Sequence, residues 1–171
     1  MMTIKVDMNN PDMAAIRSAA DALRRGELVI YPTETVYGLA ADASNEHAIK
    51  AVYDAKGRLD NHPLPVQVGC VEDVFKAVEY MSPAARRLAE LYWPGPLTMI
   101  LAKGANLPAL VTGGGNTVGV RIPDHPIALA LLKDFGGPII ATSANATGNP
   151  APTTADDAIR EVEESVSVVL D

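Results

Sequence analysis

Short apolar runs alternate along the chain with longer segments in which apolar residues recur every three or four positions. Short runs bounded by turn formers are typical of buried strands, and the longer recurrence is typical of helices packed on a core. The runs predict strands at residues 27–31, 64–69, 96–102, 117–123, 137–144 and 165–171. The recurrences predict helices at residues 11–26, 44–57, 71–80, 82–93, 125–136 and 154–164. This alternation predicts an α/β fold.

Capping residues mark the ends of several predicted helices. Gly26 and Gly57 stand where a helix should stop, since glycine readily adopts the left-handed conformation of a helix end. Short polar side chains stand at the starts, where their oxygens can accept from free backbone N–H groups. These starts are Asn10 with Pro11, Ser44 or Asn45, Ser82 with Pro83, and Thr153 or Thr154. Residues 32–43, 104–116 and 145–154 lack either pattern and are expected to form loops.

The composition predicts one globular domain over residues 1–171. Apolar residues make up 48% of the chain and charged residues 20%, so a sizeable core is available and global disorder is disfavoured. No apolar run approaches the roughly 20 residues that a membrane span needs, and no signal peptide is evident. The single cysteine, Cys70, fits a reducing cytoplasm. The net charge of −7 and 5% aromatic content argue against broad nucleic-acid binding.

Several common site motifs are absent from the sequence. It has no GxxxxGK[ST] phosphate loop, and the glycines near residues 113–119 miss the GxGxxG spacing. Its three histidines are scattered and show no metal-ligand spacing with Cys70. Ser143 lies in ATSAN rather than in the GxSxG of a nucleophile elbow.

Four polar clusters remain, each at the end of an apolar strand or helix. Ligands of α/β sheets gather outside such strand ends. The clusters combine cations with short hydroxyl and amide groups, which suits a small anionic ligand that carries phosphate or carboxylate. They are TETVY at residues 33–37; Lys56 with Arg58; Thr117 to Arg121; and Thr142, Ser143 and Asn145, with Thr153 and Thr154 beyond.

Each cluster also has a purely structural interpretation. TETVY can be a simple turn, and Lys56 with Arg58 can complement the negative end of a helix. Ser143 and Asn145 can start a loop. Arg121 is harder to explain in this way, because its strand neighbours are apolar and a charge near a core needs a partner.

Six blocks of the sequence, taken in order, resemble one known family. They are YPTETVYGLAADA, AKGR, PLPVQV, WPGPLTMIL, TVGVRIPDHP and ATSANATGNPAPTT. From about Arg25 to the last residue, the chain is similar to the YrdC-like threonylcarbamoyl-AMP synthases. The resemblance implies one twisted, mixed parallel and antiparallel sheet with flanking helices and a concave ligand-binding surface.

The resemblance also implies an activity. Members of the family join L-threonine, bicarbonate and ATP into threonylcarbamoyl-AMP and release pyrophosphate, a nucleotidyltransferase reaction. A partner transferase complex then moves the threonylcarbamoyl group to adenosine 37 of tRNAs that read ANN codons. We therefore expect a cytoplasmic enzyme that uses Mg²⁺ with ATP, has no membrane association, and makes at most weak direct contact with tRNA.

Site residues follow from the same resemblance, position by position. The family pairs a K-x-R with an S-x-N motif, and the reaction needs positioning and charge stabilisation more than acid–base catalysis. The matching catalytic residues are Lys56, Arg58, Ser143 and Asn145. ATP is expected at Arg58, His62, Thr117, Ser143, Asn145 and Thr153. Threonine is expected at Thr33, Gln67, Arg121, Thr142 and Ser143, with the guanidinium of Arg121 on its carboxylate.

The sequence also departs from its relatives. Leu59 stands where proline is usual, His62 where a small polar residue is common, and Gln67 where many members carry histidine. Members usually continue past the last strand, whereas this sequence stops at Asp171, so the tail is either absent or outside the sequence. Two alternatives stay open: a carbamoyl-handling paralogue of the same fold, and a non-catalytic RNA-binding or ribosome-associated module.

Overall fold

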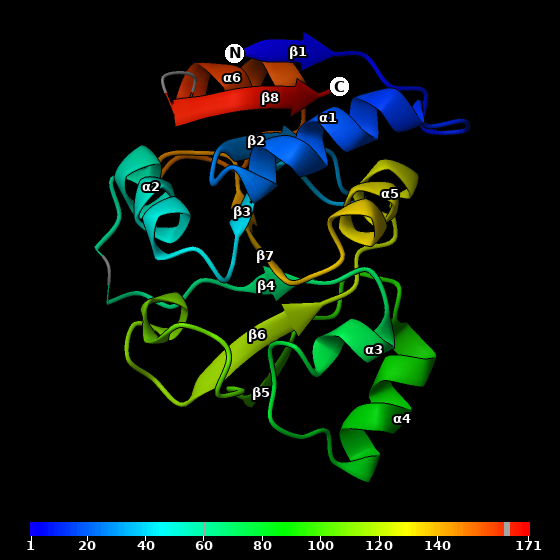
Figure 1. Cartoon of the computed structure of the whole chain (residues 1–171), viewed down its shortest axis with the longest axis vertical. Coiled ribbons are helices and arrows are strands. Elements are labelled where there is room, and N and C mark those ends of the chain that lie inside the picture. Colours follow the sequence, from blue (N-terminus) through cyan, green and yellow to red (C-terminus); the bar gives the residue numbers. More distant parts are fainter. Residues whose placement is uncertain (60, 163–164) are drawn as a thin grey trace.

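The computed structural model describes residues 1–59, 61–162 and 165–171. Its centre is an eight-stranded sheet in the order β1-β8-β2-β3-β7-β4-β6-β5, flanked by helices (Figure 1). The predicted α/β class is therefore confirmed. The strands are β1 (Met2–Ile4), β2 (Leu28–Tyr31), β3 (Gly38–Asp42), β4 (Val66–Gln67), β5 (Met99–Ala102), β6 (Thr117–Arg121), β7 (Ile139–Ser143) and β8 (Val166–Leu170).

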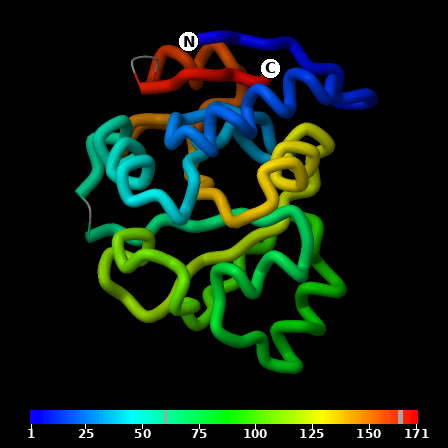
Figure 2. Tube along the Cα trace, in the orientation of Figure 1, coloured from blue at the N-terminus to red at the C-terminus, as the bar shows by residue number. Residues whose placement is uncertain are grey.

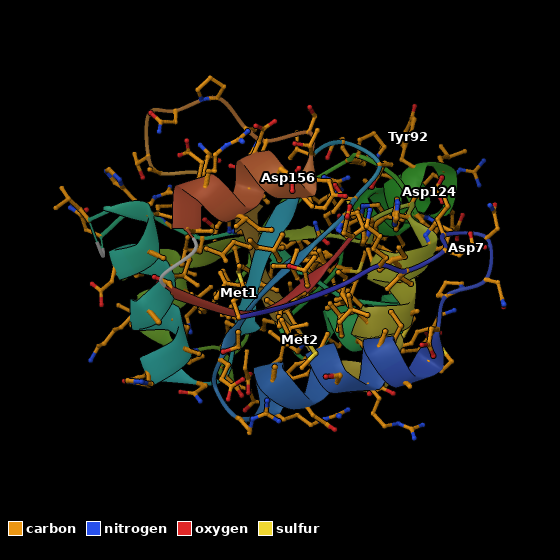
Figure 3. The ribbon with its side chains drawn as sticks, turned by 90° about the horizontal axis from the view of Figure 1, so that it is seen from above. Met1, Met2, Asp7, Tyr92, Asp124 and Asp156 are labelled. Carbon is orange, nitrogen blue, oxygen red and sulfur yellow. The ribbon has the colours of Figure 1, made fainter. Side chains whose placement is uncertain are left out.

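The sheet is mixed, as the resemblance implies. Strand β8 runs parallel to both β1 and β2, and β4 runs parallel to β6. The pairs β2–β3, β3–β7, β4–β7 and β5–β6 are antiparallel. The two ends of the described chain lie on neighbouring strands at one edge of the sheet (Figure 2). In the view from above, Met1 and Met2 lie near the middle of the picture (Figure 3).

Helices cover both faces of the sheet and create two cores. Helices α1 (Met13–Arg24) and α5 (Pro126–Phe135) pack against each other and against one face. Helices α2 (Glu46–Lys56), α6 (Ala155–Val162) and α4 (Pro83–Tyr92) contribute to the core on the other face. A single turn, α3 (Val71–Val74), precedes α4. No described helix is long and apolar enough to cross a membrane.

Most of the predicted helix boundaries hold. Asn45 caps α2, and Gly57 ends it in a left-handed conformation with φ of 56°. Ser82 caps α4, and the hydroxyl of Thr154 accepts from the Asp157 N–H at the start of α6. The first cap was predicted wrongly: Asp12, rather than Asn10, accepts from the Ala14 N–H. The predicted end of the last helix at residues 163–164 lies outside the described residues.

Some elements differ from the sequence prediction because tertiary pairing outweighs local pattern. Residues 32–43 were expected to be a loop, but β3 forms there between β2 and β7, where small residues allow close packing. The three-residue strand β1 was not predicted and exists by pairing with β8. The helix expected over residues 71–80 shortens to one turn, and the strand expected over residues 64–69 shortens to two residues.

Candidate active site

A pocket opens on the sheet face where β2, β3, β4, β6 and β7 come together. We call it the strand pocket, and its lining combines hydroxyl, amide and guanidinium groups with small apolar residues. The lining is Tyr31, Thr33, Thr35, Val36, Gly38, Gln67, Arg121, Ala141, Thr142 and Ser143. All five residues predicted for threonine line this one pocket. Gln67 and Arg121 are direct partners in the parallel β4–β6 register, so their side chains leave the same face of the sheet.

Thr33 forms a tight turn directly after β2. Its hydroxyl donates to the Val36 carbonyl at 2.6 Å and lies 3.3 Å from the backbone nitrogens of Thr35 and Val36. The turn interpretation of TETVY is therefore correct, and it does not exclude a binding role. The turn fixes the Thr33 hydroxyl at the pocket wall.

Arg121 has the partner that its apolar surroundings demand. One of its terminal nitrogens lies 2.5 Å from a carboxylate oxygen of Glu34, and its Nε donates to the Gly95 carbonyl at 3.0 Å. The two side chains are only 13% and 22% exposed. Burial works to raise the pKa of Glu34, but hydrogen bonds from the Asp124 N–H and from Arg121 outweigh it and hold that pKa below its ordinary value.

Lys56 ends α2 inside the protein. It is 4% exposed, and its ammonium donates to the carbonyls of Ser143 and Asn145, each at 2.6 Å. Burial, with a smaller contribution from the nearby Arg58 cation, lowers the pKa of Lys56 to about 8. The K-x-R and S-x-N motifs are thus joined through the Lys56 side chain, which uses two of its three N–H groups to hold the loop after β7.

The loop after β7 is also held from the side of α6. Glu161 accepts from the Ala146 N–H at 3.0 Å and from the Asn149 side chain at 2.8 Å. Asn145 donates from its amide to the carbonyls of Ala146 and Asn149. Its Oδ1 is buried and has no hydrogen-bond partner in the described part of the chain, which leaves one acceptor for a ligand or water.

Within the described parts of the chain, Ser143, Arg58 and Thr153, three of the residues predicted for ATP, line three different pockets. Arg58 is half-buried and donates to the Pro63 carbonyl at 3.2 Å, whereas His62, Thr117 and Thr153 are exposed. Arg58 lines a shallow depression on α2 with Lys50, Tyr53, Asp54 and Leu59. Thr153 lines another, beside Asp157, Arg160 and Glu161. Leu59, the departure from the family, is 67% exposed.

Three residues of this region were missed by sequence reasoning. Tyr31 closed an apolar run and was assigned to the core, yet its hydroxyl reaches Gln67. Glu34 was counted only as a member of TETVY, and its pairing with Arg121 spans 87 positions. Glu161 looked like an ordinary polar residue of an amphipathic helix. The strongest signal was Arg121 itself, because a buried cation implies a carboxylate somewhere.

The described residues offer no ready-made metal cage. Among residues 1–59, 61–162 and 165–171, no three His, Cys, Asp or Glu side chains gather closely enough to hold a metal ion. One buried oxygen, Asn145 Oδ1, is free beside the K-x-R motif. This donor set fits a Mg²⁺ ion that arrives on a triphosphate and keeps its waters.

Comparison with known proteins gives consistent matches. The family model Sua5_yciO_yrdC, described as telomere recombination, matches residues 21–171. Threonylcarbamoyl-AMP synthase of Pyrococcus abyssi is 42% identical over 156 residues, which are 91% of this chain and 46% of that protein. The Bacillus subtilis protein of the same name is 41% identical over 174 residues, 99% of this chain and 49% of its own length.

A solved structure agrees with these matches. The crystal structure of P. abyssi Sua5 complexed with L-threonine superposes with a TM-score of 0.96 at 39% identity, over 100% of this chain and 50% of that one. The chain therefore spans about half the length of the relatives that it matches. On its matched residues, its sheet order and its site, the chain belongs to the Sua5/YciO/YrdC family.

Proposed function

We propose that this chain carries the catalytic domain of a threonylcarbamoyl-AMP synthase. It would join L-threonine, bicarbonate and ATP into threonylcarbamoyl-AMP and release pyrophosphate. The observation that carries the proposal is the meeting of two sites on one sheet. The strand pocket gathers Thr33, Gln67 and Arg121, and the neighbouring S-x-N loop is tied to the K-x-R motif by Lys56. The relatives' names and the threonine-bound structure support the choice of substrate.

The strand pocket has the groups that an amino acid requires. The guanidinium of Arg121 would hold the threonine carboxylate, since planar cations recognise carboxylates well. The hydroxyl of Thr33 and the polar ends of Thr142 and Ser143 would hold the amine and the side chain. Arg121 already holds Glu34, so the substrate carboxylate must share the guanidinium or displace the Glu34 carboxylate.

The chemical step calls for charge stabilisation. The amine of threonine and bicarbonate would condense to a carbamate with loss of water. A carbamate oxygen would then bond to the α-phosphorus of ATP as the bond to pyrophosphate breaks. Arg58 is the available cation for the charge that develops on the phosphates. Lys56 holds the backbone carbonyls of Ser143 and Asn145. It would thereby keep this loop beside the reacting groups and add its own positive charge at short range. Bound Mg²⁺ would neutralise phosphate charge and align the leaving group.

The remaining ATP contacts are proposals of the same kind. His62, Thr117 and Thr153 would hold the nucleotide from exposed loops and strand ends, together with Ser143 and Asn145. Bicarbonate would enter as the third substrate. The product is a reactive mixed anhydride, so a partner transferase complex would take it to tRNA. The net charge of −7 argues against strong direct tRNA binding by this chain.

The proposal is tested by threonine-dependent release of pyrophosphate. Purified protein with ATP, Mg²⁺, bicarbonate and threonine should release pyrophosphate and form threonylcarbamoyl-AMP, detected by mass spectrometry. Omission of either threonine or bicarbonate should abolish both products. Release that ignores threonine, or tight binding of carbamoyl phosphate in preference to threonine, would instead support the carbamoyl-handling paralogue. Binding of tRNA without any turnover would support the RNA-binding module.

A further inference from the structure

A hydrogen bond crosses the floor of the strand pocket between two residues that are far apart in the sheet. The hydroxyl of Tyr31 on β2 donates to Oε1 of Gln67 on β4 at 2.9 Å. Strands β3 and β7 lie between these two strands. Both side chains are buried, with Tyr31 at 0% and Gln67 at 6% exposure. A bond of this reach needs a clear path across the intervening strands.

Gly38 provides that path. It is the direct register partner of Tyr31, and the Tyr31 ring lies over its α-carbon. A Cβ at position 38 would lie 2.8 Å from Cε1 of Tyr31 and 3.2 Å from its hydroxyl, too close for the ring to stay in place. On β7 the pocket lining includes the small residue Ala141. The tyrosine can therefore reach Gln67 because the two strands that it crosses present little side-chain bulk.

The bond fixes which end of the Gln67 amide faces a ligand. A glutamine amide has one acceptor oxygen and two N–H donors, and it can present either end. Because Oε1 is engaged by Tyr31, the NH₂ group is left for the pocket. Gln67 is also the register partner of Arg121, so its donors lie next to the guanidinium. Gln67 and Arg121 therefore both present N–H donors at this part of the pocket.

We propose that Tyr31 is a positioning residue that acts through Gln67, locking the amide so that it donates to an oxygen of the amino-acid substrate. The inference rests on the proposed function, because it assumes that the strand pocket binds an amino acid. The acceptor is either a carboxylate oxygen shared with Arg121 or the side-chain hydroxyl. Either one meets two N–H donors whose orientation is set before the ligand arrives, which lowers the cost of binding.

A double-mutant cycle separates this role from mere structural support. Threonine affinity is measured by calorimetry for the wild type, Tyr31→Phe, Gln67→Met and the double variant. Tyr31→Phe should weaken threonine binding about five- to tenfold, since the amide can then turn its oxygen to the ligand. The same change in the Gln67→Met background should alter affinity less than about twofold. In turnover assays, the KM for threonine should rise while the KM for ATP stays unchanged.

A second variant disturbs the Tyr31–Gln67 hydrogen bond by displacing the tyrosine ring. Gly38→Ala keeps the hydroxyl but displaces the ring, so it should also weaken threonine binding, and less so when Gln67 is methionine. Tyr80→Phe, which removes the hydroxyl of a 59% exposed tyrosine, is the matched control. L-valine, which replaces the hydroxyl of threonine by a methyl group, identifies the acceptor. An unchanged threonine-to-valine ratio in Tyr31→Phe assigns the carboxylate, and a reduced ratio assigns the hydroxyl.

Two results would overturn the inference, and they are distinguishable from failure of the proposed function. If the wild type binds threonine but the penalties of Tyr31→Phe and Gln67→Met simply add, Tyr31 does not act through Gln67. If Tyr31→Phe raises the KM values for threonine and ATP equally, its role is structural. If the wild type binds no amino acid at all, the proposed function fails and this inference fails with it.

Discussion

The two halves of the candidate site are built in different ways. The strand pocket consists of side chains on paired strands, and most of its polar groups already bond to one another. The other half, which we call the nucleotide face, consists of Arg58, His62, Thr117 and Thr153. These residues come from a helix end, loops and a strand end, and they are half-buried or exposed.

The difference matches what each ligand demands. A small amino acid has few atoms, so its recognition depends on accurately placed hydrogen bonds in a rigid, buried setting. A triphosphate has several charges spread over a larger volume, so a few cations on adaptable elements are sufficient. Lys56 combines properties of the two halves, because it is buried like the strand pocket and cationic like Arg58 of the nucleotide face. Four substitutions test whether the two halves bind their ligands independently.

Arg121→Ala should give the largest effect and should be confined to the amino-acid side. Loss of one partner in a largely shielded, hydrogen-bonded charge pair costs about 2–5 kcal/mol, which is roughly 30- to 4,000-fold in kcat/KM for threonine. It would also leave the Glu34 carboxylate without its cation. Steady-state kinetics at saturating ATP measures the loss, and Arg17→Ala, at an exposed position on α1, is the control. A similar loss in ATP affinity would contradict the division into two halves.

Arg58→Ala should affect turnover and leave threonine binding alone. Removal of one group that stabilises developing charge commonly lowers kcat about 100- to 1,000-fold. Calorimetry should give an unchanged threonine affinity, because Arg58 does not line the strand pocket. Arg58→Lys should restore part of the rate, since the nucleotide face requires charge more than shape. If threonine affinity falls together with kcat, the two halves are coupled through this residue.

Lys56 should give opposite pH responses in activity and stability. Its pKa falls from an ordinary 10.5 to about 8, so kcat should decline above pH 8, approaching tenfold per unit. Between pH 8 and 10.5 the unfolded chain holds more protons than the folded one, so the Lys56 contribution to stability should rise with pH. Rate profiles and thermal unfolding against Lys56→Met, which has no titrating amine, measure both. Identical profiles for the two proteins would exclude Lys56 as the source.

Glu161→Ala should have the smallest effect of the four and should fall on the nucleotide side. The variant loses the acceptor for the Ala146 N–H and the Asn149 amide, so the loop after β7 loses these bonds to α6 and keeps those to Lys56 and Tyr37. We expect about a fivefold rise in the KM for ATP, typical of a lost exposed hydrogen bond, and no change in threonine affinity. Glu161→Gln, which keeps one acceptor oxygen, should recover most of the loss. Equal defects in the two variants would argue that charge, rather than geometry, matters at this position.

Local signals in the sequence predicted the parts of the fold and site that depend on neighbouring residues. The Asn45 cap and the Gly57 stop of α2 follow from the chemistry of helix ends, and both are present. The need of Arg121 for a partner followed from its apolar neighbours. The sequence did not identify Glu34 as that partner. Glu34 is 87 positions away, and contacts made across a sheet cannot be recognised from neighbouring residues in the sequence.

Tertiary context explains what was missed. Strand β3 contains glycine and alanine instead of the β-branched residues that typically indicate a strand. It forms because β2 and β7 pair with it on both sides. Gly38 of this strand also leaves room for the Tyr31 ring to reach Gln67. The small residues that made β3 hard to predict therefore also form the floor of the strand pocket. Lys56 was predicted as a catalytic cation, and the structure adds that its ammonium bonds to the protein's own backbone.

The ion pair between Arg121 and Glu34 also bears on how substrates find the site. Because each charge is neutralised by the other at 2.5 Å, the strand pocket projects almost no net field into solution. Threonine, a zwitterion, would therefore arrive by simple diffusion, at a rate that is nearly insensitive to ionic strength. ATP instead meets the guanidinium of Arg58, which forms no ion pair with any carboxylate that the structure describes, so its arrival should slow as salt screens that attraction.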